Sequence, residues 1–127
     1  MEDSNNLITP ATKYTPEIVL NADKGLISLS GKSYPENTFE FYAPFLAWVE
    51  NYFKKPQTVT TVNMEIIYFN SSSSKLFFDF FDLVEECSSN TEVIINWIYD
   101  EENESALEAG EDFAEDFESL NFQIVSK

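Results

Sequence analysis

The stretch YFNSSSSK, residues 68–75, stands between an apolar run and a new helical pattern. The run before it, residues 59–69, starts as an alternating pattern and ends as the continuous Ile66-Ile67-Tyr68-Phe69, which predicts a strand in a sheet covered on both faces. Asn and Ser are favoured N-caps, so a helix is expected to begin directly after this strand. A helix N-terminus has unpaired N–H groups and a partial positive charge, so it tolerates a phosphate. On residue chemistry alone, however, the favoured interpretation is that the four serines are capping and turn residues only.

Outward from this junction, strand patterns alternate with helix patterns. Short alternating segments around residues 18–20 and 27–29 flank the turn-rich residues 21–25, which predicts a hairpin. The capping box Asn37-x-x-Glu40 predicts a first helix that ends near residues 54–56. The remaining expected elements are a helix over 72–87, a strand over 93–99, a helix over about 103–117 and a short strand around 122–124. The order ββαβαβαβ predicts an α/β fold in which helices pack on a mixed sheet with an N-terminal hairpin.

Length and composition predict one domain. The chain has 127 residues, of which 43% are hydrophobic, and this is enough apolar material for one core. No linker or internal repeat interrupts the pattern. We therefore expect a polar N-terminal leader over residues 1–15 and a single domain over residues 16–127.

The charge of the chain limits its partners. Its net charge is −16, from 23 acidic and 7 basic side chains, and every basic residue is Lys. Such a surface repels phosphate backbones and anionic head groups, which argues against nucleic acid or membrane as partner. Without Arg or His, the chain lacks the forked phosphate clamp and the usual acid–base group near neutral pH. The first residues show no signal peptide or membrane-spanning pattern, so we expect a cytoplasmic protein.

Patterns for catalysis and metal binding are weak. Cys87 is the single cysteine, which gives no disulfide and no metal-ligand cluster. The acidic residues between positions 100 and 118 do not fit the calcium-loop template and are better explained as a solvated helix face. Ser72-x-x-Lys75 matches the spacing of some Ser-Lys acyl-transfer enzymes, but the companion motifs are missing. We expect no metal, no cofactor and no small-molecule substrate, with a Ser-Lys hydrolase kept as an alternative.

The helix expected over residues 72–87 has two distinct sides. One side gathers Leu76, Phe80, Leu83, Val84 and Cys87, and should face the sheet. The outer side brings Phe78 and Phe81 near Ser71 and Ser74. Exposed aromatic clusters commonly mark interfaces, so this outer side predicts a partner-docking patch. The alternative is that a neighbouring helix or the leader covers these rings.

Five blocks of the sequence resemble the signature segments of one known family. They are Ser33-Tyr34-Pro35-Glu36-Asn37, Trp48-Val49-Glu50, Tyr68-Phe69-Asn70-Ser71-Ser72-Ser73, Trp97-Ile98-Tyr99-Asp100 and Glu108-x-Gly110-Glu111-Asp112-Phe113. From about Tyr14 to the end of the chain, their order and spacing are similar to those of the SiaC-type regulatory phosphoproteins. The resemblance implies a bacterial switch protein with a fold like the STAS domains of anti-sigma-factor antagonists.

The resemblance also implies how such a switch works. A partner protein kinase phosphorylates the family members, a PP2C-type phosphatase removes the phosphate, and the unphosphorylated form binds and activates a diguanylate cyclase. The implied phosphoacceptor is the hydroxyl residue directly after Tyr-x-Asn, which is Ser71 here, where the familiar form has Thr; Ser72 is a possible competitor. The expected partner-binding residues are Asn70, Ser74, Lys75, Phe78 and Phe81. An anti-sigma-factor antagonist in a partner-switching pathway remains the alternative regulator.

Overall fold

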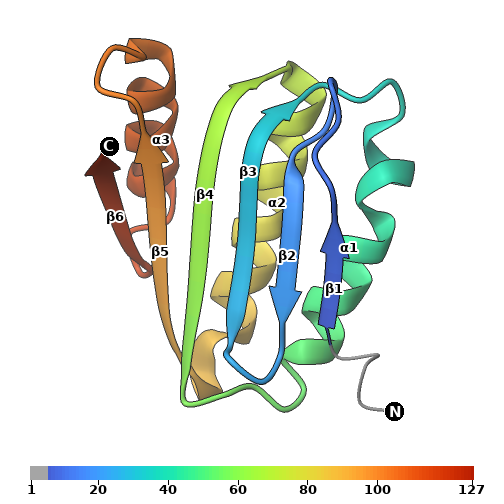
Figure 1. Ribbon diagram of the computed structural model, residues 1–127. Coiled ribbons are helices and arrows are strands. Elements are labelled where there is room, and N and C mark those ends of the chain that lie inside the picture. Colours follow the sequence, from blue (N-terminus) through green and yellow to red (C-terminus); the bar gives the residue numbers. More distant parts are fainter. Residues whose placement is uncertain (1–5) are drawn as a thin grey trace.

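The computed structural model describes residues 6–127. It consists of one six-stranded sheet with three helices packed on one side (Figure 1). The strands are β1 (Asn6–Thr9), β2 (Glu17–Asn21), β3 (Leu26–Ser33), β4 (Val59–Phe69), β5 (Glu92–Tyr99) and β6 (Asn121–Ser126). The helices are α1 (Thr38–Tyr52), α2 (Ser71–Cys87) and α3 (Glu104–Asp116), and a short 3₁₀ turn, η2 (Ser88–Asn90), follows α2. The expected single-domain α/β fold is confirmed.

The strands follow one another across the sheet in chain order. The pairs β1–β2 and β2–β3 are antiparallel, whereas β3–β4, β4–β5 and β5–β6 are parallel. Each parallel pair is joined by one of the helices, as expected from the alternation of strand and helix patterns. The sheet is therefore mixed, with the predicted hairpin at its N-terminal end.

The predicted order lacks one strand. Residues 6–9 were expected to belong to a polar leader, but they form β1 and pair with β2, with Leu7 opposite Leu20. The four residues of β1 have mixed polarity, and they are too few for hydrophobic periodicity to identify them as a strand. The observed order is thus βββαβαβαβ.

The prediction of a sheet covered on both faces is wrong. Along β4 the buried side chains alternate with partly exposed ones, and the three helices lie on one side of the sheet in Figure 1. The continuous run at the end of β4 has a different cause. The register with β3 shifts near Gly31, where Ile66 and Tyr68 become partners of consecutive β3 residues. This irregularity leaves Ile67 and Tyr68 each 54% exposed and turns Phe69 toward the helices.

Trp97 makes a close contact between the sheet and helix α3. Trp97 of β5 is fully buried, and its indole Nε1 donates a hydrogen bond of 2.9 Å to the carbonyl oxygen of Ala106. Gly110, one turn further along α3, lies against the same ring, and a Cβ atom there would come within 2.4 Å of Trp97 Cδ1. The helix can approach the sheet this closely only because position 110 has no side chain.

We expect Gly110→Ala to destabilise the protein by about 1–3 kcal/mol, although alanine is the better helix former by about 1 kcal/mol. The added methyl group must displace Trp97 and strain its bond to Ala106. Urea unfolding measures the change. The control Glu111→Ala, at an exposed position of the same helix, should stay within about 0.5 kcal/mol of wild type. A Gly110→Ala protein as stable as wild type would contradict this account.

Candidate functional site

The junction between β4 and α2 consists of a single residue. Asn70 is the N-cap of α2, and its side-chain oxygen accepts a hydrogen bond of 2.9 Å from the backbone N–H of Ser73. The backbone N–H of Asn70 donates to the carbonyl oxygen of Ser33 at 3.1 Å, which ties the start of α2 to the end of β3. Asn70 was expected to contact a partner, and the structure gives it this capping contact.

The four serines after the cap have different environments. Ser71 and Ser72 are exposed, Ser74 is half-buried and Ser73 is fully buried. The Ser73 hydroxyl lies 2.7 Å from the Ser33 hydroxyl, which in turn lies 2.6 Å from the hydroxyl of Tyr42. A protein kinase can reach only an exposed hydroxyl, so this buried chain removes Ser73 from the candidates. The implied acceptor Ser71, which is the first residue of α2, and its competitor Ser72 are both accessible.

A groove of about 430 Å³ runs between α2 and α3 beside this terminus. Its α2 wall contains four of the residues singled out from the sequence, namely Ser71, Ser74, Lys75 and Phe78. Its other lining residues are Phe69, Ala109, Asp112, Phe113 and Asp116. Ser72 is exposed but does not line the groove. The candidate binding site thus combines a hydroxyl, an aromatic floor and carboxylates.

The two aromatic residues expected on the outer side of α2 differ in exposure. Phe78 is 43% exposed, and its ring centroid lies 4.9 Å from that of Phe117. Phe81 is fully buried, with ring centroids 5.1 Å from Phe113 and 5.2 Å from Phe122. The prediction that Phe81 lies on a docking surface is wrong, because α3 and β6 pack over that sector of α2. For Phe81, the alternative interpretation that a neighbouring helix covers the ring is confirmed.

Lys75 lies on the exposed side of the groove. Its Nζ is 3.7 Å from the carboxylate of Asp79, one turn along α2, and its side chain is 71% exposed. A catalytic lysine base needs a desolvated setting beside its nucleophile. A solvated ammonium paired with a carboxylate does not offer that setting, so the geometry gives no support to a Ser-Lys hydrolase.

The sequence pattern did not identify the carboxylates of the groove as site residues. Asp112 and Asp116 belong to the acidic pattern that the sequence assigned to a solvated helix face, and both are indeed exposed. Their spacing of four residues places them on one side of α3. Only the packing of α3 beside α2 turns that side into a wall of the groove.

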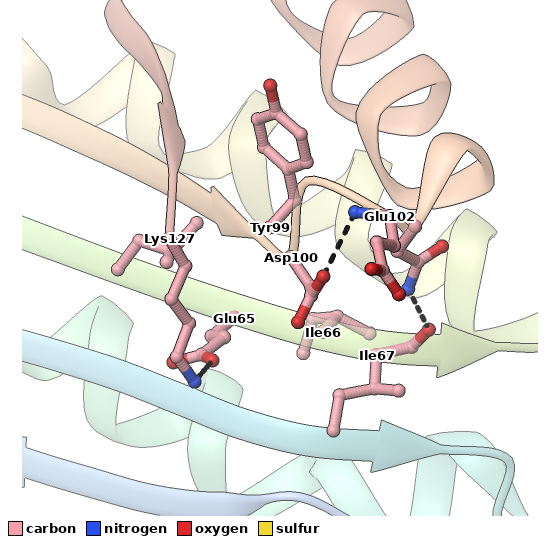
Figure 2. A pocket seen from close by; sticks show the side chains of 9 residues that line it. Glu65, Ile66, Ile67, Tyr99, Asp100, Glu102 and Lys127 are labelled. Atoms are coloured by element: carbon pink, nitrogen blue, oxygen red, sulfur yellow. Dashed lines mark hydrogen bonds and ion pairs between the residues drawn. The ribbon is translucent and has the colours of Figure 1, made fainter.

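A second hollow, of about 460 Å³, lies at the end of β4 and β5 (Figure 2). Figure 2 shows Lys127 paired with Glu65, and the backbone N–H of Glu102 bonded to the carboxylate of Asp100. The side-chain amide of Asn103 donates a hydrogen bond of 3.0 Å to the carbonyl oxygen of Ile67. Lys127, Glu65, Asp100 and Asn103 of this hollow are thus already engaged in bonds within the protein. Within residues 6–127, no cluster of three or more His, Cys, Asp or Glu side chains could hold a metal ion, and no helix could span a membrane.

The fold and the groove define a small α/β binding domain that presents a hydroxyl-bearing helix terminus at the edge of an aromatic cleft. The chain belongs to the SiaC family of regulatory phosphoproteins, whose family model matches residues 9–127. An uncharacterized protein of Pseudomonas aeruginosa strain UCBPP-PA14 is 35% identical over 113 residues, which cover 88% of this chain and 90% of that protein.

Two solved structures of SiaC from Pseudomonas aeruginosa share the fold. The apo-SiaC crystal structure is 32% identical, with a TM-score of 0.83 over 96% of this chain and 98% of the other. The second is a chain from the crystal structure of the diguanylate cyclase SiaD in complex with its activator SiaC; it is 34% identical, with a TM-score of 0.83 over 94% of this chain and 97% of the other. These similarities confirm the family resemblance. The further likeness to STAS domains stays a prediction.

The burial of the Tyr42 hydroxyl under α2 predicts a loss of stability at high pH. Burial raises the pKa of Tyr42 from 10.0 to about 12, and the hydrogen bond with Ser33 lowers it by a smaller amount. The pKa of Tyr42 is higher in the folded than in the unfolded protein. Its contribution to the free energy of unfolding is therefore complete below pH 10 and is lost as the pH rises toward 12. We expect wild type to lose about 2–3 kcal/mol across that range relative to Tyr42→Phe. Urea unfolding at several pH values tests this, and parallel curves for the two proteins would contradict it.

Proposed function

We propose that this protein is a non-enzymatic, phosphorylation-switched binding protein of the bacterial cytoplasm. Its unphosphorylated form binds and activates a diguanylate cyclase, a partner kinase phosphorylates Ser71 and thereby blocks binding, and a PP2C-type phosphatase reverses the block. The observation that carries this proposal is that Ser71 is exposed, begins α2 and lines the same groove as Phe78. The SiaD–SiaC complex supports a diguanylate cyclase as the partner.

The position of Ser71 suits a modification that leaves the fold intact. Phosphorylation adds about −1.5 to −2 charges at neutral pH, and a helix N-terminus stabilises negative charge. The Asn70 cap and the buried Ser73 hydroxyl are both separate from the Ser71 side chain. The modification therefore changes the surface and leaves the packing beneath α2 in place.

The same position explains why a phosphate would block a partner. A dianion on the groove must lose part of its hydration when an apolar side chain packs against Phe78, and that desolvation is costly. Lys75 lies one turn from Ser71 and is already paired with Asp79, so it offers the phosphate a weak and exposed partner. Most of the desolvation cost thus remains uncompensated.

We expect Ser71 to accept the phosphate when the protein is incubated with its cognate kinase. Mass-spectrometric site mapping should place one phosphate on Ser71, and Ser71→Ala should abolish the modification. Ser72→Ala serves as the matched control, because its hydroxyl is also exposed but lies outside the groove lining. If Ser71→Ala still takes up a full equivalent of phosphate while Ser72→Ala takes up none, the acceptor is Ser72.

We expect substitutions of Phe78 and Phe81, two of the phenylalanines of α2, to separate the effect on binding from the effect on stability. Phe78→Ala should weaken cyclase binding roughly tenfold to a hundredfold, and cost about 1 kcal/mol of stability because the ring is partly exposed. Phe81→Ala should instead destabilise the fold by about 3–5 kcal/mol, because it leaves a cavity among Phe113, Phe117 and Phe122. Calorimetric titration and thermal melting measure the two effects. If Phe78→Ala binds the cyclase as tightly as wild type does, the docking surface lies outside this groove.

A further inference from the structure

The α3 wall of the groove carries carboxylates that have no partner among the described residues. Asp112 and Asp116 are both exposed, and within residues 6–127 neither forms an ion pair or a side-chain hydrogen bond. On the opposite wall, Lys75 is already paired with Asp79. The groove therefore holds a net negative charge that its own residues leave uncompensated.

The surroundings reinforce this charge. Helix α3 contains no basic residue, and its carboxylates are Glu104, Glu108, Glu111, Asp112, Glu115 and Asp116. Between Lys75 and Lys127 the sequence contains no other basic residue, and the whole chain carries a net charge of −16. A field of this sign attracts cationic segments and repels anionic ones.

The floor of the groove is apolar. Phe69, Phe78 and Phe113 line it together with Ala109, and Phe78 is 43% exposed. An apolar side chain placed there would cover Phe78, which is left partly exposed by residues 6–127. An aromatic floor beside a carboxylate wall fits an apolar anchor flanked by cations.

We propose that the α2–α3 groove binds a cationic peptide segment. An apolar side chain of the segment packs against Phe78 and Phe113, and neighbouring Lys or Arg side chains pair with Asp112 and Asp116. The two aspartates stand about 6 Å apart along the helix, which sets the spacing of the cations that they accept. This inference depends on the proposed function only in naming the diguanylate cyclase as the protein that carries the segment.

A cationic partner also defines how phosphorylation acts. The cations face α3, whereas Ser71 stands on the α2 side of the groove. Attraction between the phosphate and these cations opposes the block, so the block comes from the volume and hydration of the phosphate beside the apolar anchor. Ser71→Asp, which is smaller than phosphoserine and carries less charge, should therefore weaken cyclase binding less than phosphorylation does.

The first test compares two charge reversals that differ only in where they lie on α3. Asp112→Lys/Asp116→Lys changes the groove wall, and Glu111→Lys/Glu115→Lys makes the same change of charge, with the same spacing, at exposed positions outside the groove. The first pair should weaken binding to the host's full-length diguanylate cyclase at least roughly tenfold, and the control pair by less than roughly threefold. Equal losses would overturn the groove assignment while leaving the proposed function standing.

The second test does not need the cyclase. The full chain, labelled with ¹⁵N, is titrated with a short peptide in which one Leu is flanked by Lys, and with the same peptide carrying Glu in place of Lys. The Lys peptide should shift the amides of Phe78, Asp112, Phe113 and Asp116, and the Glu peptide should not. Shifts spread over the other acidic residues, or none at all, would overturn the inference.

The two tests together separate the possible failures. If the cyclase does not bind wild type but the Lys peptide occupies the groove, the proposed function is wrong and the inference stands. Thermal melting checks that each variant folds. Should the Asp112→Lys/Asp116→Lys protein be unfolded, Asp112→Asn/Asp116→Asn keeps the shape of both side chains and should still weaken cyclase and peptide binding; unchanged binding of both overturns the inference.

Discussion

The direct passage from β4 into α2 is the constraint on which the rest of this structure depends. A single residue, Asn70, separates the last residue of the strand from the first of the helix, so it must end one element and cap the other. Its side chain caps α2 through Ser73, and its backbone N–H binds Ser33 of β3. Because these bonds fix the first turn of α2 against two strands, Ser71 is presented at a defined place on the surface.

Aromatic packing converts this fixed helix into one wall of a groove. Phe69, at the end of β4, meets Phe77 of α2, Trp97 of β5 and Phe113 of α3, with ring centroids 5.5 to 6.5 Å apart. These contacts hold α2 and α3 on the same face of the sheet, and Gly110 allows α3 to approach it closely. Phe78 is left partly uncovered between the helices, and its exposed ring is the apolar surface that we propose a partner covers.

In the proposed mode of binding, charge gives the groove its selectivity. Hydrophobic surface alone accepts many partners, whereas unpaired carboxylates on one wall disfavour anionic ones. A hydroxyl on the other wall adds a position where the charge and hydration of the groove can be changed by a reversible modification. In the proposed function, recognition and regulation use different walls of one groove, so the proposed switch acts without rearrangement of the fold.

Local patterns in the sequence determined the elements, because strand alternation, helix periodicity and caps such as Asn37 and Asn70 act over a few residues. They located β2 to β6 and α1 to α3 and placed Ser71 at a helix start. Tertiary structure decided what longer-range contacts control: that β1 joins the sheet, that helices cover one face, and that Phe81 is buried under α3 and β6. It also decided that Asp112 and Asp116 face Ser71 across a groove. A helical wheel shows which side of a helix is apolar, but what packs against that side depends on residues far away in the chain.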